Sequence, residues 1–296
     1  MPLLRAAAIL ALLLGAATTT ASAQELTGTL KKVRASGAIT LGYRESSIPF
    51  SYLNSSGEPI GYSIDLCGEI VDELTAELDG MVVNVKHKPV TSETRIPALI
   101  AGEIDLECGS TTSNFERKKL VAFSPVFFVS GTKLLVKRGS AIASYRDLRE
   151  KTVAVTAGTT NQAAVKALSD KQELNIKFVV GRDHADSFAL LAAGRAEAFA
   201  TDDVLLEGLI ATNKDAADYH VVGEYLSYDP YGLMFRKDDP EFAALVDRTF
   251  ARLAQSRALV ELYDKWFHRR LPSGGRLDIP MSPQLEELFR VLGVPE

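Results

Sequence analysis

The sequence predicts an α/β protein of two lobes, joined by two extended crossings of the chain. Its 296 residues are 46% hydrophobic and 24% charged, a globular composition with enough apolar side chains for one large core or two medium ones. Strand-like and helix-like segments alternate through short connections, which favours largely parallel sheets. One extended stretch, 126–138, interrupts this alternation, which then resumes. We therefore expect a second unit wound like the first.

The first 23 residues, 1–23, are predicted to be a secretory signal peptide. Arg5 gives a positive start, the apolar run 6–17 is short for a membrane span, and Ala21-Ser22-Ala23 is an A-x-A cleavage site. An N-terminal membrane anchor is the alternative, but polar residues follow the run where a stop-transfer flank would be expected. The segment predicts an exported protein.

Charge and composition exclude several classes of partner. Removing the predicted signal peptide removes only Arg5 among the charged residues, so the net formal charge changes from −5 to −6. Nucleic acid and anionic membrane faces are therefore unattractive partners, and an anionic ligand must be captured by local geometry. The four histidines are scattered and no C-x-x-C motif occurs, so we expect neither a metal nor a cofactor.

Two cysteines, Cys67 and Cys108, stand forty-one positions apart. In an oxidising compartment they could form a disulfide, which would contribute about 3 to 4 kcal/mol by closing a loop of this length. They could equally be two small buried residues, one on a helix and one at the end of a strand. The sequence leaves the pairing open.

Residues 24–127 are assigned to lobe 1. The segment 38–44 is predicted to be a strand, and the apolar spacing predicts a helix over 65–78. The remaining elements alternate as strand, helix, strand and helix: 81–90, 92–102, 103–109 and 113–120.

Residues 128–229 are assigned to lobe 2, with the same alternation. Strands are expected at 151–156, 175–181, 195–203 and 219–226, and helices at 161–170, 184–194 and 204–213. The segments Ala98–Gly109 and Leu190–Thr201 form a weak internal repeat: a helix end, a glycine suited to a left-handed cap, an acid three residues later and an apolar strand.

Residues 230–296 are expected to return to lobe 1. A strand within 228–240 precedes two amphipathic helices, 240–256 and 257–267, and so short a segment rarely forms a stable domain alone. The chain then crosses between the lobes twice, near 127–130 and 227–230. Two adjacent crossings make a hinge, with a ligand cleft between the lobes beyond the carboxyl ends of the strands.

Three arginines follow three predicted strands of lobe 1. Ser113 and Glu116 form an S-x-x-E capping box that would start a helix at Ser113, so Arg117 falls in the first turn, against the helix dipole. Arg95 likewise falls in the first turn of a predicted helix, for which Ser92 or Thr94 is the cap. Arg44 ends the first predicted strand. Each alone could form a surface ion pair. Together, at one sheet edge, they favour two-pronged binding of carboxylates.

Lobe 2 offers complementary groups at its own strand ends. The turn 156–161 contains amides that could receive an anion. Asp202 and Asp203 end a strand, where they would either attract an ammonium or cap the next helix. His184 begins a predicted helix. Cations for more than one carboxylate, hydroxyls and an acid for an ammonium together suit an acidic α-amino acid.

Several motifs, in order and spacing, resemble the periplasmic glutamate/aspartate-binding proteins of ABC uptake transporters, which are type II solute-binding proteins of family 3. They are GYRESSIPFSYL, TSETRIP, DLECGSTTSNFER, TAGTT, DHADSF and FATDD. The likeness covers nearly all of the chain after the signal peptide. It implies a type II periplasmic-binding-protein-like fold, a periplasmic location, a permease as partner and a monomeric state.

The resemblance also implies ligand-binding residues. They are Arg117 and Thr112 for the α-carboxylate; Ser110 and Asp202 for the ammonium; Arg44, Ser92, Arg95 and His184 for the distal carboxylate; and Thr160 as a further contact from lobe 2. No catalytic residue is implied. The family pattern does not include Cys67, so the disulfide question lies outside the resemblance.

Three other functions compete with a transport protein. A same-fold cleft enzyme of the cyclohexadienyl dehydratase type would need a general acid or base, for which only His184 and Asp202 are candidates. A sensory amino-acid-binding protein would use the same closed lobes, so the sequence cannot separate it from a transport protein. A hydrolase with a Ser/His/Asp triad lacks its G-x-S-x-G motif.

Overall fold

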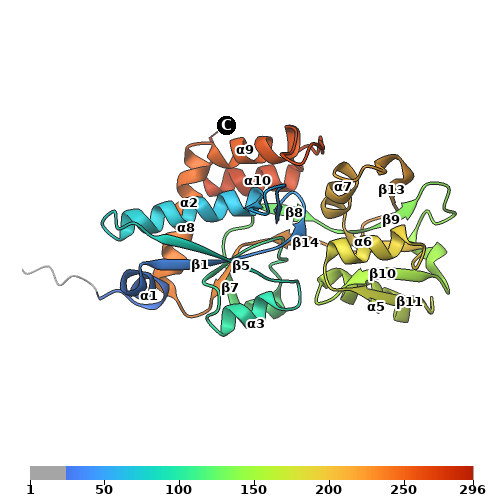
Figure 1. The fold of residues 1–296 in the computed structure, drawn as a ribbon, viewed down its shortest axis with the longest axis horizontal. Helices are drawn as coiled ribbons and strands as arrows, with labels where there is room; N and C mark the ends of the chain where they lie inside the picture. The colour runs from blue at the N-terminus through green and yellow to red at the C-terminus, as the bar shows by residue number, and fades with distance from the viewer. Residues whose placement is uncertain (1–24, 296) are drawn as a thin grey trace, which may run out of the picture.

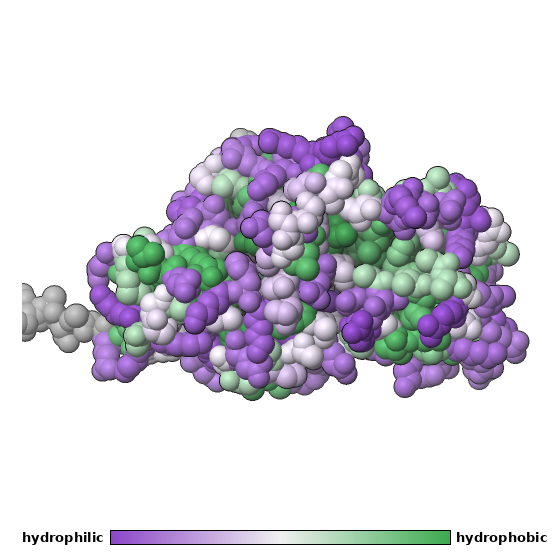
Figure 2. Space-filling model, in the orientation of Figure 1, coloured by the Kyte–Doolittle hydropathy of each residue, from purple (hydrophilic) through white to green (hydrophobic). Residues whose placement is uncertain are grey.

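The computed structural model describes residues 25–295, in two lobes that lie side by side (Figure 1). The predicted signal peptide, 1–23, lies outside the described residues. Within 25–295 no helix has the length and apolar character to cross a membrane. On the face drawn in Figure 2, hydrophilic residues cover much of both lobes, with smaller hydrophobic patches between them.

Lobe 1 is built on a five-stranded sheet in the order β5-β1-β6-β15-β7. The strands are β1 (Ala38–Tyr43), β5 (Asn84–Pro89), β6 (Leu106–Cys108), β7 (Val121–Phe123) and β15 (Met234–Arg236). β5 and β6 both pair with β1 in parallel, whereas β15 runs antiparallel to β6 and β7. The sheet is therefore mixed, because the returning chain enters it in the opposite direction.

Four helices and a small sheet complete the first part of lobe 1. The helices are α1 (Gly28–Ser36), α2 (Tyr62–Glu77), α3 (Arg95–Ile100) and α4 (Phe115–Lys118), and the small sheet contains β2 (Ser46–Ser47), β3 (Ser51–Leu53) and β4 (Pro59–Ile60). The predicted apolar face of α2 is confirmed, since Leu66, Ile70 and Leu74 are fully buried. The sequence pattern did not predict α1, which buries only Leu30 and Val33 among its apolar side chains.

Lobe 2 has a second five-stranded sheet, in the order β11-β10-β12-β9-β13. Its elements are β9 (Thr132–Lys137), β10 (Thr152–Thr156), β11 (Lys177–Gly181), β12 (Ala198–Asp202), β13 (Tyr219–Val222), α5 (Thr160–Lys171), α6 (His184–Ala192), α7 (Asp203–Ala211) and the short 3₁₀ turns η1 (Tyr145–Leu148) and η2 (Ala216–Asp218). Val153 and Val155 of β10 join one apolar cluster and Ala154 joins another. The strand is thus buried on both faces, as a central strand between helices should be.

The internal repeat has the same structure in both lobes. Gly102 and Gly194 adopt left-handed φ angles of 71° and 70° at the ends of α3 and α6. Three residues later, Asp105 accepts a hydrogen bond from the backbone of Thr40 at 3.0 Å, and Glu197 accepts one from Thr152 at 3.0 Å. In each lobe, the acid of the repeat therefore connects the turn between helix and strand to a neighbouring strand, which is β1 in lobe 1 and β10 in lobe 2.

The C-terminal helices pack on lobe 1 (Figure 1). They are α8 (Pro240–Gln255), α9 (Ala258–Tyr263), the π-turn η3 (Asp264–His268) and α10 (Pro283–Leu292). Trp266 Nε1 donates to Asp65 of α2 at 2.6 Å, which anchors this return. The helix α10 was not predicted, although Ser282 caps it with a hydrogen bond from Leu285 and Pro283 occupies its first turn.

Two antiparallel strands connect the lobes (Figure 1). They are β8 (Phe128–Ser130) and β14 (Asp229–Tyr231), paired through Pro230 and Val129 at their centre. The ring of Phe50 lies 5.0 Å from that of Phe128 and 5.1 Å from that of Tyr231, centroid to centroid, on the lobe 1 side. The predicted hinge crossings are present, and an aromatic cluster holds their lobe 1 ends.

Candidate ligand-binding site

The three arginines of lobe 1 follow three neighbouring strands. Arg44 comes directly after β1, Arg95 opens α3 after β5, and Arg117 lies in α4 after β6. Since β1, β5 and β6 are parallel, their carboxyl ends meet at one sheet edge. The arginine residues are only 1%, 2% and 9% exposed, respectively. Burial of three like charges needs compensation, because an ionised group leaves water at high cost.

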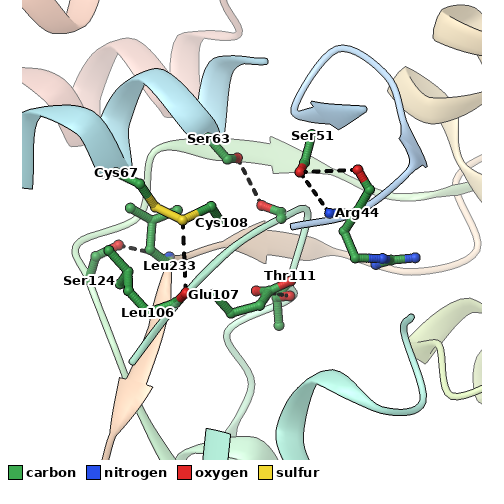
Figure 3. Close-up of a disulfide and its surroundings, with 11 residues drawn as sticks. Arg44, Ser51, Ser63, Cys67, Leu106, Glu107, Cys108, Thr111, Ser124 and Leu233 are labelled. Carbon is green, nitrogen blue, oxygen red and sulfur yellow. Dashed lines mark hydrogen bonds between the residues drawn. A yellow bond between two sulfur atoms is a disulfide. The ribbon is translucent and has the colours of Figure 1, made fainter. Parts of the chain in front are cut away.

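Arg44 has the least compensation of the three. Neither Nη atom of its buried guanidinium has a hydrogen-bond partner among the residues that the structure describes. Its backbone N–H donates to Ser51 Oγ at 2.8 Å, which fixes the start of the side chain (Figure 3). Burial, followed by repulsion from Arg95, lowers the pKa of Arg44 to about 9. The guanidinium is positioned but unsatisfied, as expected for a group that meets an anion.

Arg95 is held by a buried acid that the sequence pattern did not single out. Its Nη1 donates to Thr111 Oγ1, and Thr111 donates to Glu107 Oε2 at 2.7 Å. Glu107 is fully buried, and its Oε1 lies 3.9 Å from Arg95 Nη1. The sequence feature that could have identified Glu107 is its position between Leu106 and Cys108, the two apolar residues of β6. Glu107 offsets part of the positive charge of the cluster.

Arg117 lies in the first turn of α4, but the helix starts later than the capping box predicted. The expected start at Ser113 is wrong, because the Asn114 side chain caps the helix by accepting from Arg117 N at 2.9 Å. Ser113 N instead donates to Pro230 O of the hinge at 2.7 Å, which keeps Ser113 out of the helix.

The Arg117 guanidinium reaches from lobe 1 to lobe 2. Its Nη1 donates to Thr112 O at 3.0 Å and its Nη2 to Gly158 O, across the interlobe gap, at 3.4 Å. Burial is the main cause that lowers the pKa of Arg117 to about 9, with Arg95 adding repulsion. One edge of the guanidinium is therefore committed to backbone carbonyls.

The lobes touch each other around these residues. The hydroxyls of Thr112 and Thr160 lie 3.1 Å apart, and Ala185 N of α6 donates to Ser46 Oγ at 3.3 Å. Gly158, with φ of 71°, packs so tightly on lobe 1 that a Cβ there would lie 2.7 Å from Glu93 Cα. The structure is a closed arrangement of the two lobes.

Two predicted hydroxyls, Ser92 and Ser110, have buried Oγ atoms with no partner in the described part of the chain. Thr94 occupies the cap position of α3, but its side chain makes no cap hydrogen bond and instead accepts from Thr91 N at 2.9 Å. The Oγ atoms of Ser92 and Ser110 are therefore uncommitted within the described residues.

Asp202 is buried beside the hinge, 3% exposed, at the end of β12. It stands at the cap position of α7 without a cap hydrogen bond, and accepts instead from Asn161 Nδ2 at 3.0 Å and Tyr231 Oη at 2.6 Å. Burial, then the charge of Asp229, raises the pKa of Asp202 to about 7. A cation placed against Asp202 would reverse that shift.

His184 opens α6 in lobe 2. Its Nδ1 lies 3.1 Å from Thr156 Oγ1, and the residue is 2% exposed. Burial, together with the positive charges of Arg44 and Arg95, holds the pKa of His184 well below its usual range. The imidazole is thus neutral and available as a hydrogen-bonding group on the lobe 2 side of those arginines.

The two cysteines form a disulfide between α2 and the end of β6, with Cα atoms 6.2 Å apart (Figure 3). Cys108 precedes Gly109 and Ser110, and Gly109 O accepts from Ser63 Oγ of α2 at 2.8 Å. The bridge therefore fixes the strand end from which the hydroxyl segment starts. Between residues 25 and 295 no group of side chains has the composition of a metal site.

Two lobes that meet over buried, unsatisfied polar groups beside a two-stranded hinge characterise a bilobal binding protein for a small charged molecule. The family model of the bacterial extracellular solute-binding proteins, family 3, matches residues 39–269. The chain belongs to this family and has its type II periplasmic-binding-protein-like fold.

Two relatives of this chain have names that state the amino acids they bind or import. The chain is 44% identical to the L-glutamate/L-aspartate-binding protein of Pseudomonas aeruginosa, over 97% of this chain and 95% of that protein. It is 41% identical to the glutamate/aspartate import solute-binding protein of Escherichia coli, over 96% and 95%. A crystal structure of an ancestral amino acid-binding protein, described as a precursor of cyclohexadienyl dehydratase, matches with TM-score 0.70 and 30% identity, over 81% of this chain and 99% of that one.

Proposed function

We propose that this protein captures L-glutamate or L-aspartate between its lobes in the periplasm and delivers it to an ABC importer. The observation that carries the proposal is Arg44, whose buried Nη atoms find no partner among the described residues. A dicarboxylic ligand would supply the missing acceptors. The names of the two relatives above support the same ligand class.

The ligand's groups are assigned by the charge that faces each of them. Arg117, with Thr112 beside it, binds the α-carboxylate, and Asp202 with Ser110 binds the ammonium. The distal carboxylate lies against Arg44, Ser92, Arg95 and His184. Thr160 contributes from lobe 2. The high burial of these residues supports this assignment, because charge-assisted hydrogen bonds are strongest where water is excluded.

This arrangement should prefer acids over amides. Glutamine or asparagine would leave Arg44 and Arg95 without an opposite charge in a desolvated site, which is costly. We expect L-glutamate and L-aspartate to bind well and the two amides at least about tenfold more weakly.

Titration calorimetry with the four amino acids tests the proposal. Arg117→Ala should abolish binding of all of them, because each carries the same α-carboxylate. Equal affinity for glutamine and glutamate would refute the roles given to Arg44 and Arg95.

We propose further that the protein is not an enzyme. The two relatives above are named as binding and import proteins. The observation on the side of the dehydratase alternative is the similar structure described as a precursor of cyclohexadienyl dehydratase. Both Asp202 oxygens already accept hydrogen bonds from the protein. Incubation with cyclohexadienyl acids followed by product analysis should yield no product.

Delivery is proposed to work by lobe closure. The lobes, 24–127 with 230–296 and 128–229, would close as rigid bodies about β8 and β14, and a permease would recognise the closed form of the monomer. A glutamate uptake assay in a strain that lacks the gene separates this role from a sensory one. Import should fall in that strain, whereas unchanged uptake would favour a sensory protein.

A further inference from the structure

Asp229, on the hinge strand β14, is a buried acid that the sequence pattern did not single out. It is 1% exposed. Its Oδ1 accepts hydrogen bonds from Thr112 Oγ1 of lobe 1 at 3.0 Å and from Thr160 Oγ1 of lobe 2 at 2.9 Å, and its Oδ2 accepts from Ser227 Oγ. In the described part of the chain it takes part in no ion pair. One carboxylate thus joins a hydroxyl from each lobe.

The hydrogen bonds of Asp229 decide what the two threonines can do. A hydroxyl has one hydrogen to donate and two lone pairs that accept. When Thr112 and Thr160 each donate to Asp229, which only accepts, each uses its one hydrogen and its oxygen keeps lone pairs for another donor. Each is therefore an acceptor toward a ligand. An ammonium group offers three such donors, whereas a carboxylate offers none.

A chain of side chains links Asp229 to Asp202. Ser227 Oγ lies 2.6 Å from Thr132 Oγ1, and Asn161 Nδ2 donates both to Thr132 Oγ1 at 2.7 Å and to Asp202 Oδ1 at 3.0 Å. The two ends of this chain donate to carboxylates, Ser227 Oγ to Asp229 Oδ2 and Asn161 Nδ2 to Asp202 Oδ1. Asp229 and Asp202 therefore stand as two hydrogen-bonded acids on one network, and the charge of Asp229 acts on Asp202.

Resting on the function proposed above, we infer that Asp229 is a positioning residue that selects ligands carrying an α-ammonium group. It orients the Thr112 and Thr160 hydroxyls as acceptors and adds a second negative charge behind Asp202. This inference changes the assignment of Thr112 given above, because its hydroxyl now serves the ammonium and the α-carboxylate is left to Arg117. If Asp229 only held the two lobes together, it would strengthen the binding of all ligands equally. The proposed role instead strengthens the binding of ligands that carry an amine relative to ligands that lack one.

The test compares L-glutamate with glutarate, which has both carboxylates but no amine. Affinities are measured by calorimetry and by competition for wild type and Asp229→Asn. The amide can donate to one threonine oxygen and removes the charge, so glutamate should bind about tenfold more weakly while glutarate changes less than about twofold. The selectivity for the amine would fall about tenfold. An equal loss for both ligands, or no loss for either, overturns the inference.

Two further variants serve as a second test of the inference and as a control for stability. Thr160→Val removes one acceptor and should reduce the selectivity in the same direction, even if Asp229→Asn fails to fold. Asp239→Asn alters another buried acid, which accepts from Thr29 N at 2.7 Å and Thr29 Oγ1 at 2.6 Å outside the site, and should lower the melting temperature without changing selectivity. Absence of glutamate binding by wild type would defeat the proposed function, whereas tight binding with unchanged selectivity in both site variants defeats only the role of Asp229.

Discussion

At the scale of single residues, the candidate site contains positive charges that the protein itself neutralises only in part. Arg44 is the clearest case, because both of its buried Nη atoms lack a hydrogen-bond partner among the described residues. A buried and unpaired donor destabilises the folded protein, by roughly 1 to 3 kcal/mol for a neutral group and more for a charged one. The same group gains that free energy back when an anion binds. Stability of the free protein and ligand affinity are therefore opposed at this residue.

Arg44→Met should separate these two effects. We expect the affinity for glutamate to fall about 100-fold, since a charge-assisted contact is lost, while the melting temperature of the ligand-free protein rises by a few degrees. Calorimetry and thermal unfolding measure the two quantities.

Arg252→Met is the matched control, because Arg252 forms half-exposed ion pairs with Glu69 and Glu73 on the surface of lobe 1. It should leave the affinity unchanged and alter stability by less than about 1 kcal/mol. A lower melting temperature for Arg44→Met would contradict the view that Arg44 is held at a cost to stability.

Asp202 gives a pH prediction. Its pKa is raised to about 7 in the folded state, above roughly 3.9 in an unfolded chain. The folded protein therefore binds more protons between these values, so the stabilisation is present at low pH and is lost as the pH rises from about 4 through 7.

Melting temperatures of the ligand-free protein across this range should show a decline that Asp202→Asn removes. Parallel curves for wild type and variant would show that Asp202 titrates normally.

At the scale of elements, the turn between β10 and α5 is one of the contacts that limit how closely the lobes approach. Gly158 meets the backbone of Glu93 from the opposite lobe, and its carbonyl accepts from Arg117. A side chain at this position would hold the lobes apart. Closure therefore depends in part on the absence of a Cβ in this turn, as it does at Gly208 of α7, where a Cβ would collide with Ile48 O.

Gly158→Ala should weaken glutamate binding at least about tenfold by obstructing closure. Gly194→Ala is the matched control, because its φ of 70° is nearly the same as the 71° of Gly158, and a Cβ at Gly194 would meet no atom within 4 Å. Both changes carry similar backbone strain, roughly 1 to 2 kcal/mol, because alanine must adopt a left-handed φ at each position. Equal affinities for the two variants, measured by calorimetry, would show that Gly158 does not limit closure.

Most elements were predictable from sequence because their signals are local. The apolar spacing of α2, the glycine caps at Gly102 and Gly194 and the arginines after three strands all follow from short-range patterns. The start of α4 was misplaced because Ser113 is drawn into a contact with the hinge, which is distant in sequence. Asp229 and Glu107 could not be recognised as parts of the site, because their roles depend on contacts that only the folded chain creates.

At the scale of the whole molecule, the C-terminal helices enlarge the large apolar cluster of lobe 1, which Val204 and Leu205 of α7 also join from lobe 2, whereas the other clusters of lobe 2 are its own. The disulfide lies within lobe 1 and closes the segment between α2 and β6. The sequence left this bridge undecided because a spacing of forty-one residues says nothing about whether two side chains meet in space. Its effect should therefore concern the stability of lobe 1 more than the movement between lobes.

The double variant Cys67→Ala/Cys108→Ala should lose about 3 to 4 kcal/mol of unfolding free energy, the loop-closure contribution for this separation. Urea unfolding of the variant and of wild type, without reductant, measures the difference. Glutamate affinity should change less than about threefold, because the bridge joins two elements of the same lobe. Identical urea midpoints would contradict the stabilising role of the bridge.

The central claim is that buried arginines of lobe 1 hold both carboxylates of an amino acid on which lobe 2 closes. A crystal structure of the protein grown with L-glutamate tests it most directly. It should show the ligand between the lobes, with its distal carboxylate within hydrogen-bond distance of Arg44 and its α-carboxylate against Arg117. A structure with glutamate bound elsewhere, or with the Arg44 guanidinium turned into solvent, would contradict the claim.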